Sequence, residues 1–222
     1  MRVEWHGQAA FTLSGEEGTV VIDPFGDVSA MSRRGIQWDY PAIEVPAADL
    51  VLVTHEHLDH NGVEVVGGDP AVLRAKAGRH ASPFGEVLGI ASEHDEVAGT
   101  ERGPNTIFGF DFDGVRVVHF GDFGQAALRP EQRAAIGRVD LLFLPVGGGP
   151  TIGGEAAAAI VRELKPRWVV PMHYRTARIG FLEPEDEFVA ALGESLRPPK
   201  PFFETDNLPE GDGPTVVVPA AP

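Results

Sequence analysis

The sequence of 222 residues contains no cysteine. This absence excludes thiolate zinc fingers, cysteine nucleophiles, Cys-x-x-Cys redox chemistry and iron–sulfur ligation. Any metal site must therefore use nitrogen and oxygen ligands, which leaves histidine and carboxylate. Eight histidines and 33 acidic residues are available for such a site.

Positive charge is also scarce, since 18 lysines and arginines stand against 33 acidic residues and the formal net charge is −15. Binding to nucleic acids or anionic membranes requires a positively charged protein surface, so we expect neither as a partner. The sequence lacks an apolar run of about 18 residues, which a transmembrane helix needs. It also lacks a basic and then apolar leader at its N-terminus. These absences predict a cytoplasmic protein without a membrane partner.

Short β-branched runs bounded by turns predict most of the secondary structure. An Asp-Gly turn at residues 113–114, of the type that two-residue loops favour, joins two such runs into a hairpin. We expect strands at residues 3–5, 10–13, 19–24, 50–54, 106–112, 115–120, 140–145, 167–171 and 216–218. We expect helices at residues 69–76, 155–164 and 184–192, the first with Asp69 as its cap and Pro70 in its first turn.

The chain shows no repeat and no linker long or polar enough to separate two domains. The sequence therefore predicts a single domain over residues 1–222. Hairpins followed by strands that alternate with helices indicate an α/β (α+β) fold with two sheets covered by helices.

The strongest chemical signal is the motif His-x-His-x-Asp-His at residues 55–60, directly after a predicted buried strand. The strand end is rigid, and the loop that follows lets the side chains converge. Imidazole suits zinc, iron, nickel and copper, and carboxylate extends the range to manganese. The spacing can serve two ions, with His55 and His57 on one and Asp59 and His60 on the other. A metalloprotease of the zincin type is excluded, because its two histidines lie four residues apart in His-Glu-x-x-His.

Three further residues follow or end predicted strands and short polar runs: His94, Asp122 and His173. Together with the motif they give five histidines and two aspartates, the set that two ions with open coordination positions require. His119 lies inside a predicted strand, so we interpret it as a core residue or a support for a ligand. The glycine run at residues 147–149 is not a phosphate loop, because no Gly-Lys-Ser/Thr follows it, and we expect a rim of the site or a turn.

These residues resemble the metallo-β-lactamase superfamily of metal-dependent hydrolases, and are most similar to its UlaG-like branch. The matching segments run in the family's order from residue 1 to about residue 175. Gln8 departs from the pattern, because many relatives have a histidine there, but that position is not a metal ligand. The matching segments are Trp-His-Gly-Gln-Ala-Ala-Phe (5–11), Val-Ile-Asp-Pro-Phe (21–25), Thr-His-x-His-x-Asp-His (54–60), Ser-Glu-His-Asp (92–95), Arg-Gly-x-Asn-Thr-Ile (102–107), His-Phe-Gly-Asp (119–122) and Pro-Met-His-Tyr (171–174).

The resemblance implies a four-layer αββα sandwich with two divalent metal ions at one edge of the sheets. Zinc is the expected metal, with manganese and iron as alternatives. Asp23 would orient the motif loop from behind, as outer partners of metal ligands do. Because relatives of this branch often assemble, a homo-oligomer is a candidate state. The implied ligands are His55, His57 and His94 for the first ion, Asp59, His60 and His173 for the second, and Asp122 as a bridge between both.

Two divalent ions bring more positive charge than Asp59 and Asp122 return, so an acidic protein can present a cationic pocket to a small anionic substrate. The expected reaction is hydrolysis (EC 3) of an ester, phosphoester or lactone bond by a hydroxide that bridges the ions. Asp59 is the candidate catalytic group that takes or orients the proton. Asn105, Tyr174 and Arg175 are candidates for substrate contact.

Three alternatives stay open at this point. An RNA-processing nuclease of the same superfamily would show tight, salt-dependent RNA binding, although the charge of −15 opposes it. An iron-dependent redox enzyme would contain iron instead of zinc. A non-catalytic metal-binding or regulatory module would hold metal and hydrolyse no ester or phosphoester.

Overall fold

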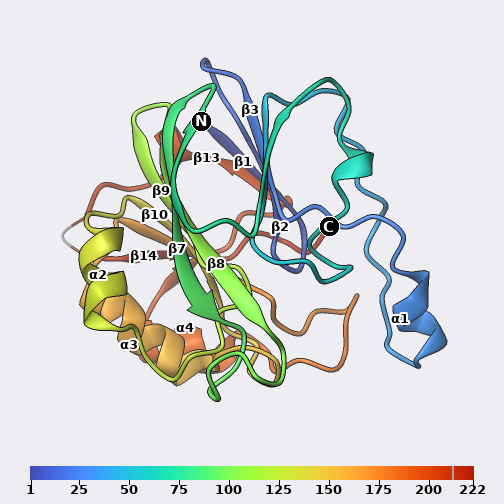
Figure 1. Ribbon diagram of the computed structural model, residues 1–222. Helices are drawn as coiled ribbons and strands as arrows, with labels where there is room; N and C mark the ends of the chain where they lie inside the picture. The colour runs from blue at the N-terminus through green and yellow to red at the C-terminus, as the bar shows by residue number, and fades with distance from the viewer. Residues whose placement is uncertain (212) are drawn as a thin grey trace.

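Two β-sheets pack face to face in the computed structural model, which describes residues 1–211 and 213–222 (Figure 1). One sheet has six strands, in the order β13-β1-β2-β3-β4-β5. The other sheet has eight strands, in the order β12-β14-β11-β10-β9-β8-β7-β6.

The elements have the following bounds. The six-stranded sheet comprises β1 (Arg2–Gly7), β2 (Ala10–Ser14), β3 (Thr19–Ile22), β4 (Leu50–Val53), β5 (Ala71–Arg74) and β13 (Phe202–Glu204). The eight-stranded sheet comprises β6 (Gly78–Ser82), β7 (Gly85–Glu93), β8 (Pro104–Phe112), β9 (Val115–His119), β10 (Leu141–Pro145), β11 (Trp168–Met172), β12 (Ser195–Leu196) and β14 (Thr215–Val217). The helices are α1 (Ser29–Arg33), α2 (Pro130–Ile136), α3 (Gly154–Leu164) and α4 (Asp186–Leu192), with short 3-10 turns at Val63–Val65 and Thr205–Asn207.

Parallel pairing brings the carboxyl ends of several strands to one edge of each sheet. In the six-stranded sheet, β3, β4 and β5 are parallel neighbours. In the eight-stranded sheet, β9, β10, β11 and β14 are parallel neighbours. Polar residues that follow these strands are therefore gathered at an edge instead of being spread over the surface.

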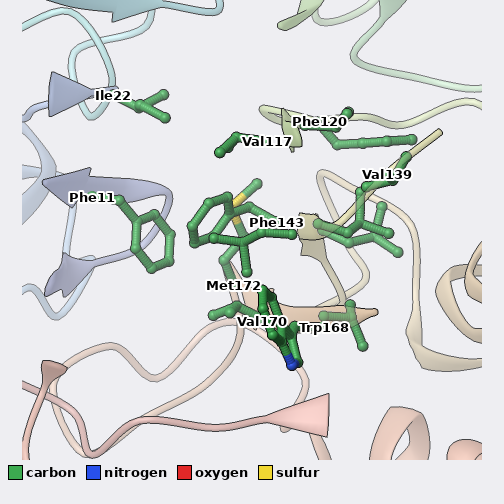
Figure 2. Packing of buried hydrophobic residues seen from close by; sticks show 14 of the residues in the cluster. Phe11, Ile22, Val117, Phe120, Val139, Phe143, Trp168, Val170 and Met172 are labelled. Atoms are coloured by element: carbon green, nitrogen blue, oxygen red, sulfur yellow. The ribbon is translucent and has the colours of Figure 1, made fainter. Parts of the chain in front are cut away.

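Large apolar side chains from facing strands fill the space between the sheets. Phe11 of β2 and Phe143 of β10 point toward each other, with ring centroids 4.3 Å apart (Figure 2). Every residue of β4, β10 and β11 is buried, as is typical of parallel strands covered on both faces. This double burial explains why their sequences are continuous apolar runs.

The outer layers differ between the two sheets. Helices α2, α3 and α4 gather on the side of the eight-stranded sheet, and α1 stands apart from them (Figure 1). The outer face of the six-stranded sheet is covered mainly by chain without regular secondary structure, in which Trp38 and Tyr40 join Val21 and Val51 in a buried cluster. The predicted class, a mixed α/β fold with two sheets, is confirmed, and extended chain provides much of one outer layer.

The predicted helix at residues 69–76 is wrong, because strand β5 lies there. Residues 71–74 pair in parallel with residues 50–53 of β4. Asp69 and Pro70 resemble a helix start, but pairing along β4 satisfies the backbone groups of both strands, which a local pattern cannot reveal. The other predicted strands and helices are present, with ends that differ by one or two residues. Additional to them are α1, α2, β6, β7, β12 and β13.

The longest helix that the structure describes is α3, with 11 residues. Within residues 1–211 and 213–222, no helix has both the length and the apolar character that crossing a membrane requires. That the whole chain forms one domain stays a prediction.

Candidate metal centre

The motif loop leaves β4 at its carboxyl end and is held by Asp23, a buried residue that follows β3. Oδ1 of Asp23 accepts a hydrogen bond from the backbone N–H of Thr54 at 2.7 Å, and Oδ2 accepts one from the Thr54 hydroxyl at 2.6 Å. Nδ1 of His60 donates to Asp23 Oδ2 at 2.9 Å. Asp23 therefore orients the loop from behind, as the resemblance implied.

Two residues of the site have a backbone conformation that side chains rarely adopt. Asp23 has a φ of +46° and His173 has a φ of +51°, both in the left-handed region. The N–H of His173 donates to the carbonyl of Gln8 at 3.2 Å, which ties it to the turn between β1 and β2. Strain of about 1–3 kcal/mol for each such residue persists only where surrounding contacts hold it, and it gathers at functional sites.

His94, Asp122 and His173 follow β7, β9 and β11, and reach the motif loop from the eight-stranded sheet. Oδ2 of Asp122 lies 3.1 Å from Nε2 of His94 and 3.2 Å from Nε2 of His173. It lies 3.3 Å from Nε2 of His60 and 3.9 Å from Nε2 of His55. One carboxylate oxygen thus faces four imidazoles, two from each sheet.

Hydrogen bonds behind the rings determine which nitrogen of His55 carries the proton. The Thr54 hydroxyl gives its one proton to Asp23, so the same oxygen can only accept from His55 Nδ1, which lies 3.1 Å away. Nε2 of neutral His55 therefore carries a lone pair. Nδ1 of His57 lies 3.0 Å from this Nε2, so the two rings bring a nitrogen each to the same place.

The same argument applies to His60 and His94. Nδ1 of His60 donates to Asp23, and Nδ1 of His94 donates to the Pro150 carbonyl at 2.9 Å. In the neutral form both rings therefore turn an Nε2 lone pair toward the carboxylate of Asp122. Lone pairs and a carboxylate repel one another at such distances unless a cation lies among them.

The electrostatics of the cluster lead to the same conclusion. Burial lowers the pKa of His60, but nearby carboxylates, led by Asp122, raise it more, and the net pKa lies well above its usual value. Burial raises the pKa of Asp122, yet His173 and His60 hold it well below its usual range. Burial, together with His60, lowers the pKa of His55 well below its usual value. The carboxylates of the cluster thus favour positive charge at its centre, while the imidazole of His55 stays neutral. This arrangement of charges suits a bound cation.

Three buried atoms at this point have no hydrogen-bond partner among the described residues: His60 Nε2, Asp122 Oδ1 and His173 Nδ1. Buried polar atoms are normally paired, so these atoms are free to contact a cation. The donor set therefore fits two divalent ions. The structure brings all seven predicted residues together, and their role as ligands stays our prediction. Each of three groups has ligand atoms within 4.8 Å of one another: His55, His57 and His94; His55, His60 and Asp122; Asp59, His60 and His173.

Asn105 holds Asp122 in place. Its Oδ1 accepts a hydrogen bond from the backbone N–H of Asp122 at 3.1 Å. Its Nδ2 donates to the Ser92 hydroxyl and to the Phe120 carbonyl, both at 2.8 Å. Asn105 is only 1% exposed and its side chain positions Asp122, so its burial argues against the predicted contact with substrate.

Gly121 lets the backbone before Asp122 pass close to the side chains of Asn105 and Thr54. It has a φ of +56°, and a Cβ there would lie 2.6 Å from the Thr54 hydroxyl oxygen and still closer to Oδ1 of Asn105. Gly114, in the turn between β8 and β9, has a φ of +73° and open space around it. An alanine at Gly114 would therefore add backbone strain without steric overlap, which makes this position the control for Gly121.

We expect Gly121→Ala to lower the free energy of unfolding by about 1–3 kcal/mol more than Gly114→Ala, because only the first change adds overlap in a packed region. We also expect it to lower the amount of bound metal, since the overlap displaces Asn105 and Thr54. Urea unfolding and elemental analysis of both variants measure these effects. Equal losses of stability in the two variants would contradict the assigned packing.

His119 is not a candidate ligand, in agreement with the sequence interpretation. Its Nδ1 accepts the backbone N–H of Gly121 at 3.1 Å, and its Nε2 donates to the Ala9 carbonyl at 3.0 Å. Both ring nitrogens are therefore used within the core, and burial lowers the pKa of the ring.

A pocket of about 560 Å³ opens over the cluster. The predicted ligands that line it are His57, Asp59, His94, Asp122 and His173. The other side chains that shape the pocket were not predicted from the sequence, because most of them lie in irregular chain. Those side chains include Met31, Arg34, Ile36, Leu58, Arg102 and Phe181.

Tyr174 and Arg175 do not line this pocket, which argues against the contact with substrate that the sequence suggested. The ring of Tyr174 is buried and stacks on Trp5, with centroids 5.4 Å apart, and burial raises its pKa above the usual range. A guanidinium nitrogen of Arg175 lies 3.7 Å from the carboxylate of Glu183. Both residues line a separate hollow near the residues 218–221.

Comparisons with known proteins agree with this fold. A profile of the Beta-lactamase superfamily domain matches residues 2–173. A UPF0173 metal-dependent hydrolase of Thermococcus kodakarensis is 31% identical over 226 residues, covering 87% of this chain and 93% of that protein. Another, from Pelotomaculum thermopropionicum, is 33% identical, covering 79% of this chain and 85% of that protein.

Among solved structures, a protein of Thermotoga maritima from the metallo-β-lactamase superfamily matches with a TM-score of 0.78 and 30% identity. The match covers 100% of this chain and 99% of that one. The chain therefore belongs to the metallo-β-lactamase superfamily, with UPF0173 proteins among its relatives. The assignment to the UlaG-like branch stays a prediction.

Proposed function

We propose that the protein is a metal-dependent hydrolase with two divalent ions, zinc being the expected metal. The observation that carries this proposal is the convergence of five imidazoles and two carboxylates, from both sheets, beside an open pocket. Relatives named as metal-dependent hydrolases support it, and the description of the Thermotoga maritima protein names zinc.

In this proposal, the exposed His57 would offer its ligand atom at the mouth of the pocket, whereas the buried His60 and His173 would offer theirs from within the protein. The position of Asp122 Oδ2 between four imidazoles supports its role as the shared ligand. The assignment is His55, His57 and His94 for the first ion, Asp59, His60 and His173 for the second, and Asp122 for both.

When bound, two such ions supply a hydroxide nucleophile at neutral pH and polarise the bond under attack, because coordination lowers the pKa of water from 15.7 to about 7. Asp59 lines the pocket, and its carboxylate lies 3.6 Å from Nε2 of His60. A carboxylate in that position can accept or hold the proton of the attacking water. Asp23 and Asn105 keep His60 and Asp122 oriented during the reaction.

The proposed substrates are esters, phosphoesters or lactones of small anionic molecules. A panel of aryl esters, phosphodiesters and lactones, assayed with protein of measured zinc content, tests this function. We expect hydrolysis that a chelator abolishes and added zinc restores. Protein that holds two zinc ions per chain and hydrolyses nothing on the panel would contradict the proposal and favour a binding module. If the protein contains iron in place of zinc, that result would favour the iron-dependent redox enzyme. Tight, salt-dependent binding of RNA would favour the RNA-processing nuclease.

A further inference from the structure

Two arginines line the pocket without a carboxylate partner. Arg34 follows α1, and Arg102 lies in the loop between β7 and β8. Most arginines of the protein pair with an acidic side chain, as Arg129 does with Glu93 at 2.7 Å. Within the part of the chain that the structure describes, Arg34 and Arg102 form no such pair. In a protein with 33 acidic and 18 basic residues, two guanidinium groups at one pocket, neither of them paired with a carboxylate among the described residues, are a local concentration of positive charge.

The two arginines reach the pocket from separate parts of the fold. Figure 1 shows α1 standing away from the ends of β7 and β8, which carry the loop with Arg102. Guanidinium groups bind carboxylate and phosphate through paired, charge-assisted hydrogen bonds. An anionic group that enters the pocket therefore finds a cationic partner beyond the metal centre.

Apolar side chains lie in the same pocket. Leu58 is 50% exposed and Phe181 is 51% exposed, although both are large and apolar. Met31 and Ile36 add further apolar surface from the segment that also carries Arg34. Apolar side chains that stay exposed inside a pocket, next to a few charged groups, are typical of a site for an organic ligand.

We propose that the substrate is an amphipathic organic anion, with a carboxylate or phosphate that binds Arg34 and Arg102 and an apolar chain that packs on Leu58 and Phe181. This proposal rests on the proposed hydrolase function, because the bond to be cleaved must lie at the metal centre. A pocket of about 560 Å³ has room for such a molecule, since ligand sites range from about 300 to 1,000 Å³.

Binding of product-like probes to the zinc-loaded protein tests the proposal by calorimetry. The probes are octanoate, octyl phosphate, acetate and octanol. We expect octanoate or octyl phosphate, whichever anion the site takes, to bind at least about tenfold more tightly than acetate, which lacks the chain, and octanol, which lacks the charge. Equal affinity for octanoate, octyl phosphate and acetate would overturn the proposal, because acetate can still bind the metals.

Variants assign the effect to the pocket. We expect Arg34→Gln and Arg102→Gln each to weaken binding of the preferred anion about fivefold to tenfold. Phe181→Ala should weaken binding of the eight-carbon anion and leave acetate unchanged. Arg33→Gln is the matched control, because Arg33 is adjacent in sequence but does not line the pocket. Unchanged affinity in both Arg34→Gln and Arg102→Gln would also overturn the proposal.

Ester hydrolysis separates this proposal from the proposed function. We expect the mono-4-nitrophenyl ester of adipic acid, which keeps a free carboxylate, to have a higher kcat/KM than neutral 4-nitrophenyl hexanoate, and Arg34→Gln to reduce that preference. Equal cleavage of both esters by the unmodified protein and by Arg34→Gln would overturn the substrate proposal and retain the hydrolase. Tight octanoate binding without cleavage of any ester on the panel would retain the pocket assignment and contradict the hydrolase.

Discussion

Replacing Asp122 by alanine is expected to leave about one zinc ion or less per chain and to lower kcat/KM at least about a thousandfold. The reason is the position of Oδ2, which lies within 3.3 Å of Nε2 in His60, His94 and His173. Without this carboxylate, no assigned ligand would be shared by both ions, and Asp59 alone would be left to offset their charge. Elemental analysis after gel filtration, together with assays on the best substrate of the panel, measures both effects.

Asp111→Ala is the control for this prediction, because the Asp111 side chain is exposed on β8 and pairs with Arg116 at the surface. His57→Ala provides a second test in case Asp122→Ala fails to fold, because His57 is exposed and its loss opens no cavity in the core. It is expected to lower metal content and to abolish activity as well. If Asp122→Ala and His57→Ala both keep two ions per chain, the ligand assignment is wrong.

Asp23→Ala is expected to destabilise the fold by about 3–5 kcal/mol and to weaken zinc binding by about 10–100-fold, although Asp23 is not a ligand. The change leaves the N–H of Thr54 and Nδ1 of His60 without their buried acceptor. Asp23→Asn is expected to keep more of the stability, because its carbonyl oxygen can still accept from Thr54. Its amide must then face the ring of His60, which turns the ring proton toward the metal centre.

Asp23→Asn therefore separates metal affinity from folding. Urea unfolding gives the loss of stability, and competition with a chelating dye gives the zinc affinity. Asp69→Ala serves as the control, because Asp69 is exposed and remote from the motif loop. Normal zinc affinity in Asp23→Asn would show that the contact between Asp23 and His60 has no part in orienting the ligand.

The candidate metal ligands could be chosen from the sequence because most of them follow strands whose apolar runs are easy to recognise. The motif at residues 55–60 begins where the buried strand β4 ends, so its placement needed only the strand and the loop after it. His94, Asp122 and His173 are single residues far apart in the chain, and the family's order of motifs linked them. Their spatial convergence depends on strand pairing that one sequence does not reveal. Strands β9, β10 and β11 are parallel neighbours, and β7 runs in the direction of β9 because the antiparallel strand β8 lies between them.

The pocket walls could not be predicted in the same way. Arg34 and Phe181 lie in chain whose position is set by contacts with distant segments, such as the hydrogen bond from Gln37 to the Ala177 carbonyl. Arg175 lies two residues after the candidate ligand His173, yet its side chain turns to Glu183. Strand β5 was likewise not predictable from the local sequence, because its pairing with β4 outweighs the helix signal of Asp69 and Pro70.

The candidate ligands come from both sheets, with His55, His57, Asp59 and His60 after β4 and His94, Asp122 and His173 on the other side. Ions held between these groups would cross-link two halves of the protein that otherwise meet mainly through apolar packing and a few hydrogen bonds. Binding to the folded chain alone adds about 2.7 kcal/mol of stability for each site at a hundredfold excess of free ion over the Kd. The lifetime of the protein would then follow the supply of metal in its surroundings, and shortage would remove the protein along with its activity.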